Sequence, residues 1–208
     1  MTYLDSLLMQ RQKIAVISDK PLEREKLETV IEAGRLAPYA GLAQKNTDTF
    51  RHFFVIKRGS RTARELEQLC SRQRILESKR IYEEGLDQKY QPAAFMAEHF
   101  KDGGAGDVFS SPWLIVIAER GAYPAREEVC LGYVMENMWL KATELQIAFK
   151  PCSIVSDIKD KVSLQKLLGL DSQEHYAFDA CNIGYPKDVV KKRENHKKPT
   201  EQITYFTD

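Results

Sequence analysis

The chain has 208 residues, of which 43% are hydrophobic and 10% aromatic, and this can fill the core of one ordinary domain. Its formal net charge of +1 at pH 7 argues against electrostatic capture of nucleic acid. No segment approaches the roughly 20 consecutive apolar residues that span a bilayer, and the first twenty residues lack the apolar core of a signal peptide. We therefore expect a cytoplasmic protein that binds neither nucleic acid nor a membrane.

The four cysteines and four histidines are scattered along the chain. There is no Cys-x-x-Cys pair, no His-Glu-x-x-His motif and no histidine at metal-ligand spacing. We therefore expect no bound metal and no disulfide framework. The glycine cluster at residues 103–106 lacks the Lys-Ser/Thr of a phosphate-binding loop, so we interpret it as a connection.

Two helices are predicted at the start of the chain. Residues 2–9 are amphipathic, with Thr2 or Asp5 available as an N-cap. The second helix is expected to start near Pro21, because proline tolerates the first helical position. Its apolar residues recur at helical spacing until Pro38, where we expect the helix to have ended.

A strand, a long helix and an irregular segment are predicted next. Residues 51–56 are a β-branched and aromatic run, which predicts a strand. Residues 61–82 carry charges of alternating sign, which is typical of a helix with a solvated outer face. The periodicity weakens over residues 83–111, so we expect a mobile connection or lid there. The whole chain, residues 1–208, is expected to form a single domain.

The second half contains the most apolar segments. Residues 112–118 are a continuous apolar run, which fits a strand covered on both faces. Residues 126–146 carry apolar side chains around most of a helical circumference, so this helix is expected to be central or at an interface. A strand over residues 147–155 follows, interrupted by Pro151.

The C-terminal part predicts one short helix and two strands. Ser156 or Ser163 is expected to cap the helix, which closes near Gly169. Residues 176–183 and 202–206 fit strands, the latter at an edge. The order of elements shows no regular βαβ repeat, so the predicted fold class is α+β.

Two cations stand two residues apart just after the first predicted helix. An extended backbone would place the side chains of Arg11 and Lys13 on the same side, where both could meet one phosphate. A solvated basic turn is the other interpretation, and the local pattern alone favours it.

Three landmarks in this order are similar to those of the flavin-dependent nitroreductase family. They are Arg11, the Ala37-Pro38 pair that ends an early helix, and Gly184-Tyr185-Pro186 followed by the basic residues 187–198. The resemblance implies an α+β fold with a central, mainly antiparallel sheet flanked by helices. It also implies a homodimer that holds FMN in a site shared between the subunits, with a C-terminal extension that embraces the partner.

The family's phosphate-binding segment is typically Arg-x-Ser-x-Arg or Lys, followed by an aromatic residue. Arg11 matches its first position, whereas Lys13, Ala15 and Ile17 replace the serine, the second cation and the aromatic. The segment Ala37-Pro38-Tyr39-Ala40 resembles the family's Ala-Pro-Ser-small segment, which leads into residues that line the flavin. The resemblance implies eleven cofactor-binding residues: Arg11, Gln12, Lys13, Pro38, Tyr39, Ala40, Pro151, Cys152, Ser153, Ile154 and Lys197.

Two further segments match the family's order. Glu136-Asn137 stands where the family's core helix has Gln-Asn, so a charge is added to a helix that packs at the dimer interface. The backbone near Cys152, Ser153 and Ile154 follows where the family presents N–H groups to flavin N5. Cys152 itself fits a small buried residue better than a nucleophile.

The resemblance implies an FMN-dependent NAD(P)H oxidoreductase that reduces small nitroaromatic or quinone-like acceptors by a ping-pong mechanism. No catalytic side chain is required, because the chemistry belongs to the flavin. Three alternatives stay open. The departures at Ala15 and Tyr39 suit a flavin-binding module without turnover, and a specialised branch of the family dehalogenates substrates reductively or fragments flavin. A basic-tail interaction protein without a cofactor is a third.

Overall fold

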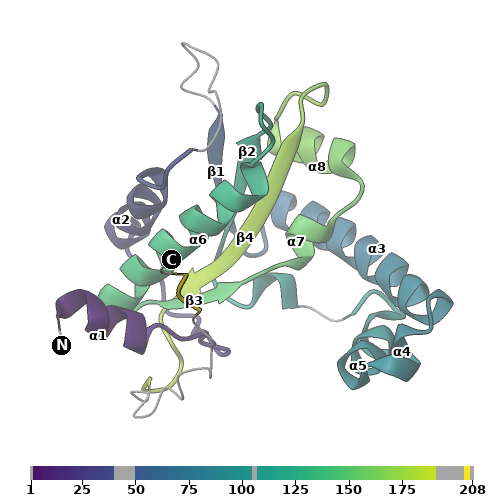
Figure 1. Cartoon of the computed structure of the whole chain (residues 1–208), viewed down its shortest axis with the longest axis horizontal. Coiled ribbons are helices and arrows are strands. Elements are labelled where there is room, and N and C mark those ends of the chain that lie inside the picture. Colours follow the sequence, from purple (N-terminus) through teal and green to yellow (C-terminus); the bar gives the residue numbers. More distant parts are fainter. Residues whose placement is uncertain (1, 40–49, 105–106, 191–203, 207–208) are drawn as a thin grey trace.

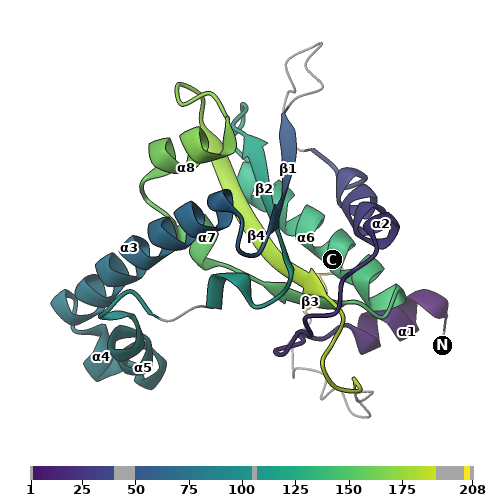
Figure 2. The same ribbon diagram turned by 180° about the vertical axis from the view of Figure 1, so that it is seen from behind.

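Four antiparallel strands form the central sheet of the computed structural model, which describes residues 2–39, 50–104, 107–190 and 204–206. The strands lie in the order β1-β2-β4-β3. Their bounds are Arg51–Lys57 for β1, Trp113–Arg120 for β2, Ala148–Pro151 for β3 and Tyr176–Gly184 for β4. Helices cover both faces of this sheet (Figures 1 and 2). The predicted α+β class with a mainly antiparallel sheet is therefore confirmed.

Strand β2 is buried on both faces, as its continuous apolar run predicted. Leu114 and Val116 belong to the core on one side of the sheet, and Ile115 and Ile117 belong to the core on the other. All four side chains are fully buried. Because successive side chains of a strand point to opposite faces, a covered strand must be apolar at every position.

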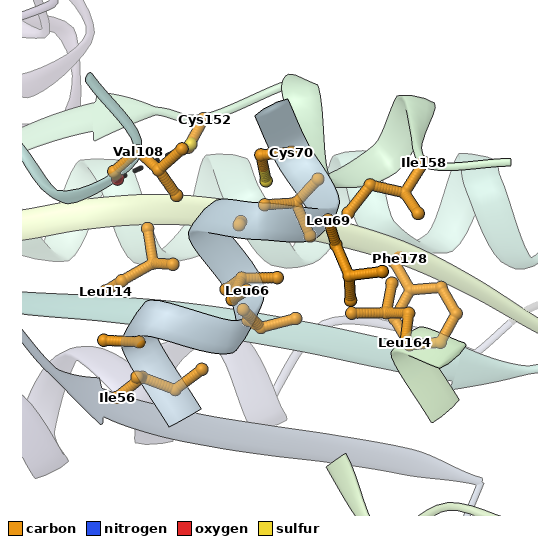
Figure 3. Close-up of a cluster of buried hydrophobic side chains, with 14 of the residues drawn as sticks. Ile56, Leu66, Leu69, Cys70, Val108, Leu114, Cys152, Ile158, Leu164 and Phe178 are labelled. Atoms are coloured by element: carbon orange, nitrogen blue, oxygen red, sulfur yellow. Dashed lines mark hydrogen bonds between the residues drawn. The ribbon is translucent and has the colours of Figure 1, made fainter. Parts of the chain in front are cut away.

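Helices α3 (Arg61–Glu83), α7 (Ile154–Asp157) and α8 (Lys161–Leu168) cover one face. Figure 3 shows the core beneath them, where Leu66 and Leu69 of α3 point toward Leu114 and Phe178 of the sheet. The predicted outer face of α3 carries its exposed charges, while its inner face supplies much of this core.

Helices α2 (Arg24–Arg35) and α6 (Glu127–Glu144) cover the opposite face. Gly34 allows α2 to approach α6 closely, since a Cβ at this position would lie 2.8 Å from Cγ of Met138. The prediction of a central helix over residues 126–146 is confirmed, because Val134, Met138 and Ala142 are fully buried. Helix α2 begins at Arg24, later than the predicted start, and has ended before Pro38 as expected.

Helix α1 (Tyr3–Gln10) packs against α6 and begins as predicted. The Thr2 hydroxyl accepts from the N–H of Asp5, and the Asp5 carboxylate accepts from the N–H of Thr2. This reciprocal capping box satisfies two backbone donors of the first turn. None of the described helices is long and apolar enough to cross a membrane.

The expectation of an irregular connection over residues 83–111 is wrong for most of that segment. It contains α4 (Leu86–Lys89), α5 (Gln91–Phe100) and a 3₁₀ turn at Asp107–Phe109. Helix α5 is anchored on α3, because Ala97 is fully buried and its carbonyl accepts from the Ser78 hydroxyl at 2.7 Å. Motion of this segment as a lid stays a prediction.

Three local expectations need correction. Asp160 caps α8 in place of Ser156 or Ser163, and its carboxylate accepts from the Ser163 N–H at 3.1 Å; the predicted closure at Gly169 is confirmed. The strand expected over residues 147–155 ends at Pro151, because α7 starts three residues later. Of the predicted edge strand, residues 202 and 203 lie outside the described residues, and residues 204–206 are not in a strand.

Leu66 is a sensitive position for stability, because it lies in the core between α3 and the sheet. We expect Leu66→Ala to lower the free energy of unfolding by about 3 kcal/mol, because it empties a fully buried site. Leu76→Ala on the same helix is the matched control: its side chain is 52% exposed, so the change should stay within about 0.5 kcal/mol. Urea titration followed by circular dichroism measures both, and equal losses would contradict this assignment of the core.

The four cysteines are buried and no disulfide joins them. Burial raises the pKa of the Cys70 thiol to about 12, and it raises that of Cys181 well above its usual range. At pH 8 a thiol with a pKa near 12 is ionised at a level of only about 10⁻⁴. We expect Ellman's reagent to label none of the four thiols in the native protein and all four after unfolding. Fast labelling of the native protein would contradict their burial.

Candidate functional site

Residues 11–18, which we call the N-terminal segment, follow α1. They run along the free edge of β3 and reach the end of β4. The N–H of Ile14 donates to the Phe149 carbonyl at 3.4 Å, and the N–H of Ser18 donates to the Tyr185 carbonyl at 2.8 Å. Ile17 forms an isolated antiparallel bridge with Pro186. The segment that follows Arg11, the first landmark of the sequence, therefore meets the third landmark in space.

Close packing explains the glycine of the third landmark. A Cβ at Gly184 would lie 2.7 Å from Cγ2 of Ile17, so a larger residue would push the N-terminal segment away from β4. Ile17, which the resemblance matches to the family's aromatic residue, is buried.

Arg11 is held by helix α6. Its Nε lies 2.9 Å from Oε1 of Glu136, an ionic contact without hydrogen-bond geometry, and its Cζ lies 4.8 Å from the ring centroid of Trp139. The Trp139 indole N–H donates to the carbonyl of Gln12 at 3.3 Å. Arg11 therefore has a fixed position, and Glu136 neutralises part of its charge.

Alternate residues of the N-terminal segment face different surroundings. Gln10, Gln12 and Ile14 line a cavity of about 710 Å³ that lies between α1, the end of α6 and the chain after β4. Arg11 and Lys13 are not among its lining residues, and Lys13 is exposed. The two cations predicted to meet a phosphate are thus separated from this cavity by their own backbone.

The backbone N–H groups that were predicted to meet flavin N5 lie in the turn after β3, and their surroundings differ. The N–H of Cys152 donates to the Ala180 carbonyl at 2.8 Å and is therefore engaged within the chain. The Cys152 thiol lies 3.8 Å from the Val108 carbonyl, in the core shown in Figure 3. Ser153 and Ile154 instead line a second cavity, so they are better placed than Cys152 to meet a ligand.

This second cavity has a volume of about 350 Å³ and lies between α3, α5 and α7. Met96 and Phe100 of α5 supply apolar wall. Its remaining lining residues are polar or charged: Gln73, Glu77, Arg80, Asp157 and Lys159. The cavity therefore combines an apolar surface with groups of both charges.

Burial and neighbouring charges shift two carboxylates of the second cavity in opposite directions. Burial raises the pKa of Asp157, and nearby Glu77 adds to this rise. The Arg80 guanidinium lowers the pKa of Glu77 by hydrogen bonding. Sequence analysis missed these residues, because the spacing of Glu77 and Arg80 is that of an exposed helical ion pair. The cavity forms only where α5 folds back on α3, and no local signal predicts that contact.

Pro38 and Tyr39 follow α2, and their contacts place them at the other end of the sheet. The Tyr39 hydroxyl donates to the carbonyl of Arg120, the last residue of β2, at 3.3 Å. The N-terminal segment lies near the first residue of β2 instead, because Ile14 bonds to Phe149, and Phe149 pairs with Ile183, the partner of Trp113. The eight residues of β2 separate this segment from Tyr39 by roughly 23 Å along the strand. The turn after β3 lies between the two ends, level with Val116, because the Cys152 N–H donates to the carbonyl of Ala180, the partner of Val116. One chain therefore does not bring all the predicted residues together, and Ala40 and Lys197 lie outside the described residues.

Comparisons with solved structures agree with this fold. A nitroreductase with bound FMN from Bacteroides fragilis is 19% identical, with a TM-score of 0.67, and the match covers 99% of this chain and 100% of that one. A BluB-like flavoprotein from Clostridium difficile is 21% identical, with a TM-score of 0.64 and complete coverage of both chains. Iodotyrosine deiodinase bound to FMN and 3-iodo-L-tyrosine is 18% identical, with a TM-score of 0.62 and coverage of 98% and 100%.

At this level of identity the structural matches establish the fold alone. No curated protein matches the sequence. A profile of the Nitroreductase family, however, matches residues 8–185, which include the N-terminal segment, both cores and the end of β4. The chain therefore belongs to the nitroreductase family.

Proposed function

We propose that the chain is an FMN-dependent NAD(P)H oxidoreductase whose cofactor site is shared between two copies. The observation that carries this proposal is the separation of two half-sites. Arg11 and Lys13 lie beside β3, whereas Pro38 and Tyr39 lie at the far end of β2. A two-fold axis brings opposite ends of two identical chains together, so each flavin would meet one half-site from each copy.

The residues beside β3 fit a flavin phosphate and ring. Arg11 and Lys13 supply two positive charges after α1, and charge-assisted contacts are the strong ones for a phosphate. The Arg11 side chain is 34% exposed and its contact with Glu136 lacks hydrogen-bond geometry, so the guanidinium can also meet a ligand. Ser153 and Ile154 offer backbone N–H groups at the surface of the second cavity for the ring. Lys197 is proposed as a further phosphate cation.

Helix α6 offers a surface for the second copy. Val129 and Tyr133 are about half exposed on a helix whose other side is buried, and a Cβ built on Gly132 meets no atom within 4 Å. An exposed apolar strip of this kind fits contact with another protein surface better than contact with water. We propose that this strip and the C-terminal extension form the homodimer interface of a cytoplasmic protein.

When bound, FMN would supply the electron chemistry between NAD(P)H and a small organic acceptor. The protein would then have to position the acceptor and to stabilise negative charge. Backbone donors at Ser153 and Ile154 are suited to stabilise negative charge without a catalytic side chain. Met96 and Phe100 offer an apolar wall to an acceptor ring, and 350 Å³ lies within the range of small-molecule sites. Nitroaromatic and quinone-like acceptors suit this cavity.

A second candidate is reductive dehalogenation, and the mixed charges of the same cavity favour it. Arg80 and Lys159 can meet a carboxylate, while Glu77 and Asp157 can meet an ammonium group. A zwitterionic aromatic acceptor would use both sets. The candidates differ in the acceptor alone, so one panel of acceptors separates them.

The central test is anaerobic stopped flow on the purified protein. We expect a yellow protein that releases FMN, because the two half-sites are built for its phosphate and ring. NADH or NADPH should bleach the flavin absorbance, and a nitroaromatic compound or a quinone should restore it. Light scattering on the same sample should give about twice the chain mass of 23.9 kDa.

Three outcomes would change the proposal. Restoration by 3-iodo-L-tyrosine but not by nitroaromatics would favour the dehalogenase. Tightly held flavin that neither nicotinamide bleaches would favour a binding module without turnover. A colourless protein that binds no FMN on titration would overturn the flavin site.

Glu136 should weaken the phosphate site by competing for Arg11. We expect Arg11→Ala to lower FMN affinity by about one to two decades, the value of a charge-assisted contact of roughly 1.5–3 kcal/mol. Glu136→Gln should raise FMN affinity by up to about fivefold, because a half-exposed ion pair is worth about 0.2–1 kcal/mol. Flavin titration of the apoprotein measures both.

Two controls separate this contact from general effects. Glu28→Gln removes the same charge from an exposed position on α2 and should leave the affinity unchanged. The double variant Arg11→Ala with Glu136→Gln should resemble Arg11→Ala alone, since Glu136 acts only through Arg11. Equal affinities of the wild type and Arg11→Ala would remove Arg11 from the site.

A further inference from the structure

Arg51 makes an unusually complete set of contacts at the far end of the sheet. Its side chain is 6% exposed, and that of its partner Glu119 is fully buried. Nε donates to Oε2 of Glu119 at 2.6 Å, and Nη2 donates to Oε1 at 3.1 Å. This is a bidentate pair between the first residue of β1 and the neighbouring strand β2.

The remaining N–H groups of the Arg51 guanidinium hold the end of helix α2. Nη1 donates to the carbonyls of Gly34 at 3.3 Å and Ala37 at 2.9 Å, and Nη2 donates to that of Pro38 at 3.3 Å. The last carbonyls of a helix lack partners within the helix and carry its negative dipole end. Arg51 therefore caps α2 and reaches one residue further, to Pro38.

Five hydrogen bonds match the five N–H donors of a guanidinium. A lysine has three donors on one atom and cannot join a carboxylate on one side to three carbonyls on the other. Stability alone does not require such an arrangement, because apolar residues can often replace a buried ion pair without lowering the free energy of unfolding. The five bonds instead fix the position of the backbone at Pro38.

The segment held in this way has few other anchors. Pro38 is exposed, whereas Tyr39 is half-buried, with its ring 4.1 Å from that of Phe50. Beneath Pro38, the Arg51 guanidinium links the backbone to β1 and to β2 through Glu119. The exposed side of Pro38 remains available to a ligand or to a second copy.

The geometry points to Arg51 and Glu119 as positioning residues, which set where Pro38 and Tyr39 stand against the flavin bound mainly by the other copy. This inference rests on the proposed shared FMN site. Neither residue touches the flavin in this arrangement; each acts through the backbone of Pro38. Displacement of a positioning segment by about 1 Å can cost a factor of up to 10² in a site that depends on orientation.

The test compares two conservative arginine variants at adjacent strand ends. Arg51→Lys keeps the charge but cannot make five bonds, and it should weaken FMN binding by about tenfold or more. It should also alter the visible circular dichroism of the bound flavin. Arg120→Lys is the matched control, because Arg120 pairs bidentately with Glu174 and its backbone carbonyl still accepts from Tyr39. We expect it to leave both readouts within about twofold of the wild type.

A double-mutant cycle with Pro38→Gly tests the route of the effect. If Arg51 acts through this segment, Arg51→Lys should cost little further affinity in the Pro38→Gly background. Should Arg51→Lys not fold, Glu119→Gln, which keeps the three carbonyl contacts, should shift the same readouts in the same direction by less.

Two results would overturn the inference. The first is a lower melting temperature of Arg51→Lys apoprotein with unchanged FMN affinity and unchanged flavin dichroism, which would make the pair purely structural. The second is strict additivity in the cycle with Pro38→Gly. A wild-type protein that binds no FMN would instead overturn the proposed function, and this inference with it.

Discussion

The burial of β2 and β4 on both faces is the constraint on which the rest of the molecule depends. Helices α3, α7 and α8 cover one face of the sheet, and α2 and α6 cover the other, so the described side chains on both faces form apolar cores. Polar contacts are therefore found at the ends of the strands. Arg51 and Glu119 mark one end, and the N-terminal segment marks the other.

A buried polar group within this sheet must be satisfied locally, and Asn182 shows how this is done. Its side-chain amide donates to the Val108 carbonyl at 2.9 Å, and its carbonyl accepts from the Ser111 hydroxyl at 3.1 Å. The N–H of Ile183 donates to the same hydroxyl at 3.2 Å. These bonds join β4 to the chain that precedes β2, so the cost of burying an amide is offset by a fixed connection.

Much of the fold could be predicted from the sequence because strong local patterns decide it. The apolar run of β2, the capping box of α1 and the apolar circumference of α6 each predict one structure. Helix α5 was missed, because its stability comes from packing Ala97 against α3 rather than from a periodic pattern of its own. Asp160 was missed as a cap because two serines nearby offered the same chemistry.

The candidate site was predictable only where residues adjacent in sequence carry it. Arg11 and the Gly184-Tyr185-Pro186 landmark were recognised locally, and the structure brings their segments together. Glu136 was recognised as a change of charge, but its contact with Arg11 depends on how α1 meets α6. The five bonds of Arg51 join three segments distant in sequence. No spacing rule identifies such a residue, because an arginine before a strand is common and only tertiary packing supplies its acceptors.

The departures from the family's pattern are accommodated within the chain rather than left as gaps. Ile17 replaces an aromatic residue and packs closely on Gly184, where the absence of a side chain makes room for it. Tyr39 replaces a serine, stacks on Phe50 and bonds the end of β2. Both contacts fasten their segments to the sheet. The proposed site, divided between two copies, would benefit from this, because each half would have to hold its geometry before the other arrives, and order already present in the free chain need not be created on association.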